Sequence, residues 1–186
     1  MLNMKILVTY YSVTGNTKKI AEAIYDAASE GNEIDLKDLN DISIKAFSNY
    51  DLVFLGSACH DSDLTHIVLQ FLKTTPKTSD FKLAGFVTHA SYTAEKGDYE
   101  KEMYDKWAGR CIKSFESFAQ DNNVTFLGFF NCMGIPSPPI EKFIHDQIVT
   151  EEEQWVKYLE IIKKHPDEND IADAKQFAKE IIEKFG

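Results

Sequence analysis

Small hydrogen-bonding side chains gather in one short segment, where a buried-type apolar run gives way to a helical pattern. The apolar run covers residues 5–10, and apolar residues recur at helical spacing from Ile20 to Ala27. The segment between them therefore leads into a helix, where backbone N–H groups lack intrahelical partners and the helix dipole is positive. This arrangement favours a bound phosphate. The residues that we expect to contact it are Ser12, Val13, Thr14, Gly15, Asn16 and Thr17.

The same segment contains no lysine. The first basic residue is Lys18, which already belongs to the helical pattern, and Gly15 permits close approach of a ligand to the backbone. Neutral donors alone indicate a monophosphate that stays bound rather than a phosphate that is transferred. The alternative is an ordinary polar turn between a strand and a helix.

Two segments resemble the flavodoxin family. Ser12, Thr14, Gly15 and Thr17 match its phosphate-loop pattern Ser/Thr-x-Thr-Gly-x-Thr, and residues 50–57 are similar to its third strand and the start of its first flavin loop. The element order resembles the family over most of the chain. The resemblance implies that FMN is the cofactor, with its 5′-phosphate held by the first loop.

Apolar runs and helical patterns alternate along the chain, which predicts an α/β fold with a parallel sheet and helices on both faces. We expect a single domain over residues 1–186, and the resemblance implies the flavodoxin-like strand order 2-1-3-4-5. Helices are expected after the first strand and at about 64–73, 103–120 and 170–185. Strands are expected at residues 5–10, 33–37, 51–56, 82–88 and 124–130.

In such sheets ligands bind beyond the carboxyl ends of the strands, a rule whose standard illustration includes flavodoxin itself. After the third strand we expect Ser57, Ala58, Cys59 and His60 to form the first flavin loop. His60 falls where many flavodoxins carry an aromatic residue beside the flavin ring, although a solvent-exposed loop histidine is the alternative. Asp61 and Asp63 would add negative charge there.

The loop after the fourth strand is expected to hold the other side of the flavin. An aromatic residue usually covers the outer flavin face in the family, and Tyr92 is the candidate, with Tyr99 as the rival. Its ring would exclude water while its hydroxyl stays solvated. The loop residues that we expect at the cofactor are Thr88, His89, Ala90, Ser91 and Tyr92.

The composition narrows the class of protein. The chain carries 30 acidic and 20 basic residues, a net charge of −10, which argues against nucleic-acid binding. We found no apolar run of membrane-spanning length and no secretion signal, so we expect a cytoplasmic protein. The three cysteines, Cys59, Cys111 and Cys132, are expected to be reduced thiols.

Residues 132–165 are expected to form an insertion that a minimal flavodoxin lacks. We expect a stiff, extended proline segment through Pro139, then one extra helix from Thr150 with a capping box to Glu153. Its apolar stripe would comprise Trp155, Leu159 and Ile162. The insertion is expected to pack on the core, to contact a partner or a second copy in a homodimer, or to narrow access to the flavin.

The leading functional hypothesis is a low-potential one-electron carrier. Acidic groups near the flavin would disfavour its anionic reduced form, and the acidic surface would dock basic patches on a reductase and an acceptor. The alternative is an FMN-dependent oxidoreductase that transfers electrons from NAD(P)H to a quinone or another small acceptor, with His60 or His89 as proton donor. A flavin-free interaction domain of the same fold is a third class.

Overall fold

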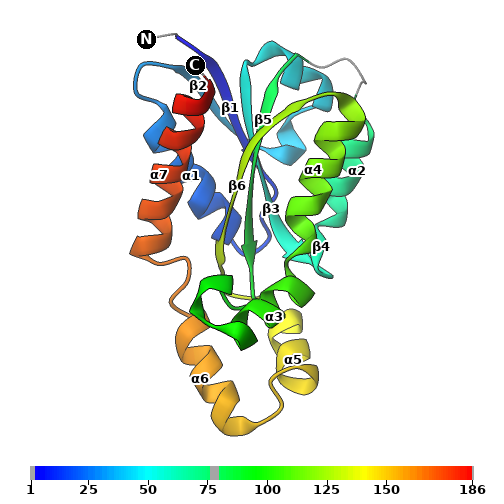
Figure 1. Ribbon diagram of the computed structural model, residues 1–186, viewed down its shortest axis with the longest axis vertical. Coiled ribbons are helices and arrows are strands. Elements are labelled where there is room, and N and C mark those ends of the chain that lie inside the picture. Colours follow the sequence, from blue (N-terminus) through cyan, green and yellow to red (C-terminus); the bar gives the residue numbers. More distant parts are fainter. Residues whose placement is uncertain (1–2, 76–79, 186) are drawn as a thin grey trace.

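The computed structural model describes residues 3–75 and 80–185. Within them, five parallel strands form a sheet of order β2-β1-β3-β5-β6, which confirms the expected topology (Figure 1). A short strand, β4, pairs antiparallel with the end of β3. The strands are β1 (Lys5–Tyr10), β2 (Glu33–Asp38), β3 (Leu52–His60), β4 (Asp63–Leu64), β5 (Lys82–His89) and β6 (Thr125–Met133).

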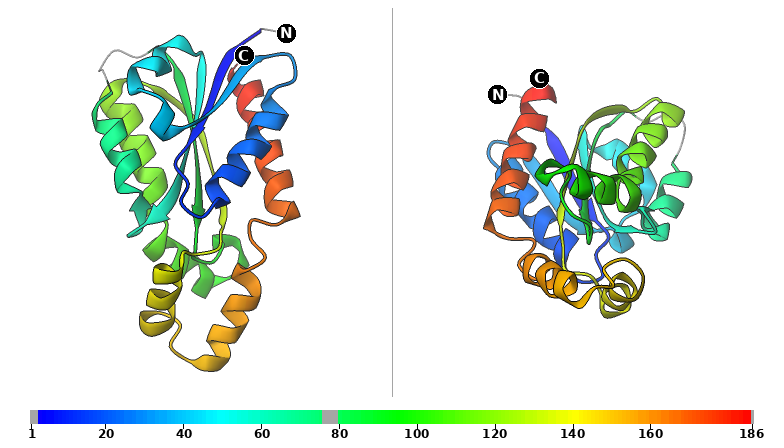
Figure 2. Two further views of the ribbon diagram at one scale, coloured as in Figure 1. Left: turned by 180° about the vertical axis from the view of Figure 1, so that it is seen from behind. Right: turned by 60° about the horizontal axis from the view of Figure 1, so that its bottom comes forward.

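Helices cover both faces of the sheet, as Figures 1 and 2 show. α1 (Asn16–Ala28) and α7 (Glu168–Phe185) pack on one face, and α2 (His66–Lys73) and α4 (Arg110–Asn122) on the other. Successive strand residues point to opposite faces. In β1, Ile6 and Val8 therefore join the cluster under α1 and α7, whereas Leu7 joins the cluster under α2 and α4. Both faces of β1 are buried, as the apolar run predicts.

The third strand is longer than its apolar pattern indicates. The expected strand ended at residue 56, but β3 continues to His60 and then folds back into β4. Asp61 and Ser62 make the reversal with φ values of 50° and 67°. Such left-handed conformations are tolerated by short polar side chains, which is why the segment lacks an apolar signature. The prediction of a loop from Ser57 onward was wrong.

One long helix over residues 103–120 was also predicted wrongly. The chain forms α3 (Asp98–Trp107) and α4 instead. Ala108 leaves the helical conformation, with φ −142° and ψ −16°, and is followed by Gly109, a weak helix former. The break turns α3 away from the core, so that no described α3 residue is fully buried.

The insertion after β6 contains two helices rather than an extended segment and one helix. α5 (Pro138–Gln147) starts with two prolines, whose fixed φ suits the first turn of a helix. α6 (Glu152–Ile162) follows it closely. The predicted capping box is absent, because Glu153 pairs with Lys157 at 2.6 Å and α6 has no side-chain cap.

We call α5 and α6 with their connection the helical hairpin (residues 138–162). It lies beyond the carboxyl ends of the strands (Figures 1 and 2). Its apolar side chains Ile144, Trp155, Tyr158 and Ile162 form a third cluster with Met133 at the end of β6, separate from the two clusters under the sheet faces. The insertion therefore builds its own small core against the end of the sheet.

Three short 3-10 helices complete the described elements: η1 (Leu39–Asp41), η2 (Ile44–Asn49) and η3 (Ala94–Lys96). Across residues 3–75 and 80–185, none of the helices has both the length and the apolarity needed to cross a bilayer.

Candidate functional site

The loop between β1 and α1 exposes the start of a helix. Gly15 adopts φ 90°, a conformation that favours glycine, and its N–H donates to Ser12 Oγ at 3.1 Å. The backbone bond from Lys19 N to Gly15 O at 3.0 Å starts the helical pattern, and α1 has no side-chain cap. The N–H groups of the first turn are therefore oriented outward toward the loop, as anion binding requires.

Asn16 connects this loop to the segment that follows β6. Its Nδ2 donates to Thr14 Oγ1 at 2.9 Å and to the Ile135 carbonyl at 2.7 Å. Gly134 lies so close that a β-carbon there would be 2.9 Å from Asn16 Nδ2. The post-β6 segment is thus part of the loop's environment, a contact that no local sequence signal revealed.

Thr17 joins the first helix to the end of β5. Its side chain is 1% exposed, and its hydroxyl lies 2.8 Å from the hydroxyl of Thr88. The sequence places both residues at the site, and the structure brings them into direct contact.

A small cavity of about 50 Å³ lies where the loops after β1, β3 and β5 meet. This convergence was predicted from the sheet topology. The segment after β6 forms the remaining wall. The lining residues from the predicted set are Val13, Thr14, Asn16, Ala58, Cys59, His60, Thr88, His89 and Ala90.

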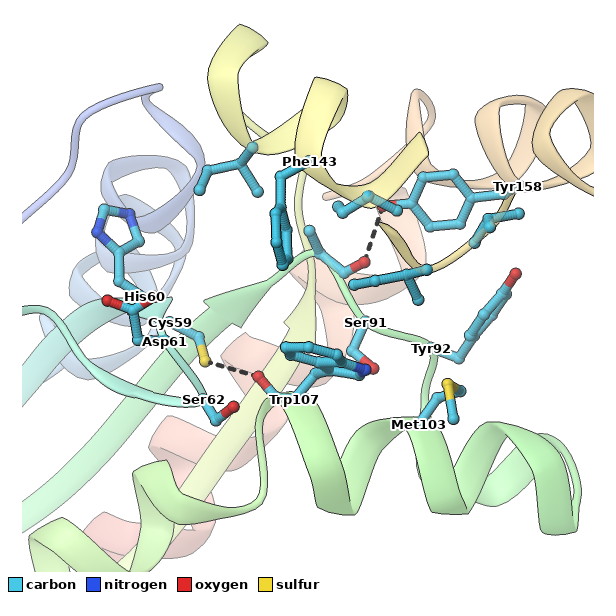
Figure 3. A pocket seen from close by; sticks show the side chains of 15 residues that line it. Cys59, His60, Asp61, Ser62, Ser91, Tyr92, Met103, Trp107, Phe143 and Tyr158 are labelled. Atoms are coloured by element: carbon cyan, nitrogen blue, oxygen red, sulfur yellow. Dashed lines mark hydrogen bonds between the residues drawn. The ribbon is translucent and has the colours of Figure 1, made fainter. Parts of the chain in front are cut away.

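A larger cavity of about 120 Å³ adjoins it and shares Cys59, His60, Ala90 and Ile140 with it. Aromatic rings from three helices line this cavity, as Figure 3 shows. Trp107 from α3 and Phe143 from α5 meet edge to face, with ring centroids 6.1 Å apart. Neither residue was predicted to lie at the site, because Trp107 fits the apolar stripe of the helix expected over residues 103–120 and Phe143 lies in α5, which was not expected. The third ring comes from Tyr158 of α6.

Two polar atoms in the wall of the larger cavity have no hydrogen-bond partner in the described structure. They are Ser91 Oγ and Trp107 Nε1, and both are buried. Leaving a buried donor unpaired costs about 1–3 kcal/mol, so a ligand that pairs with either group would be stabilised by that interaction. The donor set fits a flat, conjugated ligand with polar atoms along one edge, joined to an anion held at the start of α1.

The loop residues of β3 take different positions. Ser57 is buried away from both cavities, where its Oγ accepts from Thr65 N at 3.0 Å and supports the start of α2. Cys59 Sγ donates to the Trp107 carbonyl at 3.2 Å, and His60 is exposed at the rim of both cavities. Ser57 is therefore not brought to the site.

The position of Tyr92 agrees with its predicted role beside the flavin ring. Tyr92 lines the larger cavity. The centroid of its ring lies 5.9 Å from that of Tyr99 and 5.8 Å from that of Tyr158. Burial, followed by the neighbouring Tyr99, raises the pKa of Tyr92 above its usual value. Tyr99 is 50% exposed and does not line either cavity.

Negative charge near the cavities is less than the sequence indicated. Asp63 accepts from Ser114 at 2.6 Å and lies 3.7 Å from Arg110, so its charge is partly balanced. Asp61 remains exposed on the wall of the larger cavity.

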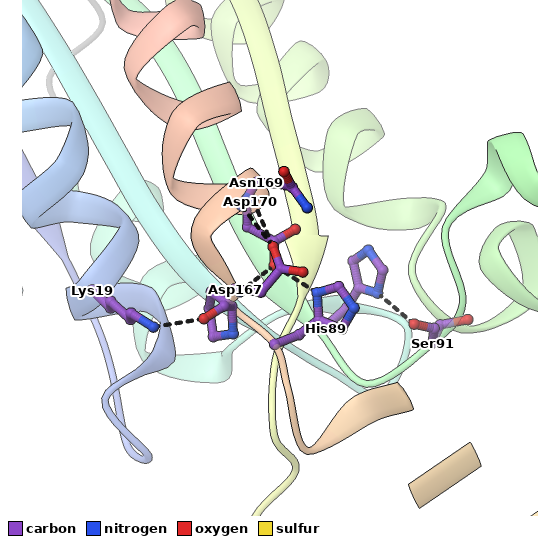
Figure 4. A network of polar contacts seen from close by, with 8 residues as sticks. Lys19, His89, Ser91, Asp167, Asn169 and Asp170 are labelled. Carbon is purple, nitrogen blue, oxygen red and sulfur yellow. Dashed lines mark hydrogen bonds and ion pairs between the residues drawn. The ribbon is translucent and has the colours of Figure 1, made fainter. Parts of the chain in front are cut away.

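A polar network positions the neighbouring backbone (Figure 4). His89 is buried, with Nδ1 3.2 Å from the Ser91 carbonyl and Nε2 3.0 Å from Asn131 Oδ1. Lys19 on α1 donates to the Pro166 carbonyl at 2.6 Å, ahead of α7. These bonds fix the loop after β5 and the first helix relative to the sheet.

The start of α7 gathers His165, Asp167 and Asp170. His165 Nδ1 lies 2.6 Å from Asp170 Oδ2, and Asp167 Oδ1 accepts from the Asn169 and Asp170 amides. These amide bonds lower the pKa of Asp167. The cluster therefore caps the helix with its own hydrogen bonds.

Comparisons with known proteins agree with this geometry. A family model described as "Flavodoxin domain" matches residues 7–179. The chain is 33% identical to the "Flavodoxin-like domain-containing protein BilS" of Clostridioides difficile (strain CD3), covering 96% of this chain and 97% of that protein. It is 30% identical to "Uncharacterized protein MJ0298" of Methanocaldococcus jannaschii, covering 96% of this chain and 99% of that protein.

Among solved structures, oxidised Flavodoxin 1 from Bacillus cereus superimposes with a TM-score of 0.63 at 18% identity, covering 96% of this chain and 97% of that one. This likeness shows the fold. With the family match over residues 7–179, it establishes that this chain belongs to the flavodoxin family and that its cofactor is FMN.

Proposed function

We propose that this protein is a low-potential one-electron carrier that passes electrons between partner proteins through bound FMN. The observation that carries the proposal is the pairing of a lysine-free anion site at the start of α1 with an adjoining aromatic cavity at the same edge of the sheet. FMN supplies the electron-transfer chemistry, while the protein binds it and tunes it.

We assign the FMN phosphate to the loop before α1. Thr14 and Asn16 line the small cavity, and the first-turn amides of α1 supply further donors. Thr17 is the buried hydroxyl behind them, already oriented by Thr88. Uncharged donors hold the phosphate without neutralising it, which suits a cofactor that stays bound.

We assign the flavin ring to the larger cavity. Tyr92, Trp107 and Phe143 provide the apolar walls, and Ser91 Oγ and Trp107 Nε1 provide two donors that lack partners in the described structure. The aromatic walls exclude water, which strengthens electrostatic interactions inside the cavity. Asp61 at the wall and the net charge of −10 then disfavour added negative charge on the ring. The second electron would enter at a lower potential than the first.

The proposed partners are a reductase and an acceptor that carry basic docking surfaces. The acidic surface supports this proposal, because association between oppositely charged surfaces is fast at low salt and slows as salt is added.

A second candidate function is an FMN-dependent NAD(P)H:quinone oxidoreductase. The observation that favours it is the enclosure of the larger cavity by α3, α5 and α6, because aromatic walls suit a planar acceptor. His60 at the rim is then the proton donor with access to solvent.

An anaerobic redox titration of the FMN-loaded protein tests the carrier. Two resolved one-electron steps, the second at low potential, are expected, and a single two-electron step would contradict it. Steady-state quinone turnover with NAD(P)H, reduced in His60→Gln, would instead favour the oxidoreductase. Asp61→Asn, which removes an exposed charge from the cavity wall, is the matched control. It should raise the reduction potential of the second one-electron step without creating quinone turnover.

A further inference from the structure

A buried histidine lies in the wall of the small cavity. His89 ends β5, is 3% exposed and lines the same cavity as Thr14 and Asn16 of the loop before α1. Among the described residues this wall contains no lysine or arginine, and its other histidine, His60, is exposed. His89 is therefore the side chain in this wall that can carry a positive charge while it is shielded from water.

Both ring nitrogens of His89 face oxygen atoms. Nδ1 lies 3.2 Å from the Ser91 carbonyl (Figure 4), and Nε2 lies 3.0 Å from Asn131 Oδ1. Because a carbonyl oxygen only accepts, both bonds form when the imidazole carries a proton on each nitrogen. A half-turn of the Asn131 amide would present its NH2 group to Nε2 and suit the neutral ring. The surrounding groups thus accommodate both protonation states of His89.

The titratable and charged groups around His89 come from several elements. Tyr104 of α3 meets the imidazole edge to face, with ring centroids 5.3 Å apart. Cys59 and His60 of β3 lie in the same cavity wall. The polar network of Figure 4 adds groups from α1 and the start of α7, which are Lys19, His165, Asp167 and Asp170. These groups are present with or without FMN, so the phosphate is the charge that changes on binding.

We propose that His89 takes up a proton when the FMN phosphate binds, so that a buried imidazolium becomes the counter-charge of the cofactor. The proton comes from the solvent and adds to Nε2, which then donates to Asn131 Oδ1. The inference rests on the proposed placement of the phosphate before α1. It does not depend on whether the protein is a carrier or an oxidoreductase.

The size of the cavity couples the two charges. Burying a lone imidazolium is costly, but an opposite charge close by favours the charged form. The uncharged donors of the loop leave the phosphate charge in place, and a cavity of about 50 Å³ keeps that charge near His89. The interaction is strong there because little water screens it.

Calorimetry of the flavin-free, full-length chain measures the proton uptake. FMN is titrated at about pH 8 in buffers of different ionisation enthalpy, and the variation of the binding enthalpy with the buffer gives the number of protons. At this pH the phosphate is already a dianion, because its second pKa is about 6, and an ordinary histidine with a pKa of about 6.5 is neutral. Riboflavin, which lacks the phosphate, is the matched control ligand.

The expected result is a difference between the two ligands. FMN should take up about 0.5–1 proton more than riboflavin. The Kd for FMN should therefore rise up to about tenfold per pH unit between about pH 7 and pH 9, whereas the Kd for riboflavin should stay nearly constant.

Three variants assign the proton to one residue. His89→Gln should lose the extra uptake and the pH dependence of the FMN affinity, whereas His60→Gln should keep both. Asn131→Asp places a carboxylate at Nε2, which should hold His89 charged before FMN arrives and so also remove the uptake. Circular dichroism establishes that each variant is folded, and Asn131→Asp keeps the test decisive if His89→Gln does not fold.

Nuclear magnetic resonance identifies the charged ring without reference to affinity. In protein labelled with nitrogen-15 in its five histidines, one ring should gain a proton on its second nitrogen when FMN is added. Riboflavin should not produce this change, and the signal should be missing from His89→Gln.

The proposal is overturned if FMN and riboflavin take up equal numbers of protons, or if the extra uptake survives in His89→Gln or Asn131→Asp. FMN that binds more tightly than riboflavin without extra proton uptake would overturn the role of His89 and leave the phosphate placement intact. FMN that binds no more tightly than riboflavin would contradict the phosphate placement, and this inference with it.

Discussion

Gly134 approaches Asn16 so closely that an added β-carbon would lie 2.9 Å from Asn16 Nδ2 and 3.1 Å from its Cβ. The contact joins the segment after β6 to the loop before α1, which are distant in sequence. It allows Asn16 Nδ2 to donate hydrogen bonds to both Thr14 Oγ1 and the Ile135 carbonyl. The anion site is therefore held in shape from outside its own motif.

Gly134→Ala should lower FMN affinity by displacing Asn16. Loss of its hydrogen bonds, each worth about 0.5–1.5 kcal/mol, corresponds to a decrease of about tenfold. Titration of flavin fluorescence measures it. In an Asn16→Ala background the same glycine change should be nearly neutral, giving a coupling of about 1 kcal/mol. Equal effects in both backgrounds would show that Gly134 acts elsewhere.

Thr17→Val removes a buried hydroxyl while keeping the side-chain shape. If this hydroxyl donates to the phosphate, a charge-assisted bond of about 1.5–3 kcal/mol is lost and FMN affinity falls about tenfold to a hundredfold. Thr17→Ser retains the hydroxyl and should retain most of the affinity. Calorimetry with FMN compares the two, and an unchanged affinity in the valine variant would place the phosphate elsewhere.

Trp107→Phe should affect the cofactor more than the fold. The indole N–H has no partner in the described structure, so its removal should leave the stability of the flavin-free protein within about 1 kcal/mol, while FMN affinity falls by several-fold. The measurements are urea unfolding and FMN titration.

The chain has two tryptophans, which provides a control. Trp155 stacks on His145 and does not line the larger cavity. In Trp155→Phe, FMN should quench most of the remaining Trp107 emission. If FMN quenched the Trp155 emission of Trp107→Phe as strongly as the Trp107 emission of Trp155→Phe, the assignment of Trp107 to the flavin ring would be contradicted.

Tyr158 predicts a change of stability in alkaline solution. Burial raises its pKa above the usual value, so the folded state keeps the phenol neutral while the unfolded chain ionises near pH 10. Its stabilising effect is complete below about pH 10 and is lost as the pH rises toward the raised value.

Tyr158→Phe should therefore cost about 0.5–1.5 kcal/mol at neutral pH, through loss of its bond to the Ala90 carbonyl, and progressively less above pH 10. Urea unfolding at several pH values measures this, with Tyr25→Phe on α1 as the control. A cost that is independent of pH would contradict the prediction.

The parallel sheet and its outer helices were predictable because their signals are local. β1, β5 and α7 appear close to the expected positions, since apolar runs and helical stripes report directly on burial. The phosphate loop was recognisable for the same reason: Gly15 and its hydroxyl neighbours are adjacent in sequence.

The aromatic wall of the larger cavity was not predictable from local sequence patterns. Trp107 fits the helical stripe that continues through Cys111, and only the break at Ala108 turns it into the cavity. Phe143 lies in α5, whose two leading prolines are typical of extended chain as well as of a helix start. Both outcomes depend on tertiary contacts that a single sequence does not display.

The bond from the Tyr158 hydroxyl to the Ala90 carbonyl, 2.8 Å long, joins the far end of the molecule to the loop that lines both cavities. Local opening of α6 must break this bond, so the protection of its amides against deuterium exchange depends on how firmly that loop is held. A ligand in the larger cavity, which contacts Tyr158 and orders the loop, should slow deuterium exchange throughout α6, and the helical hairpin would then report whether the cavity is occupied.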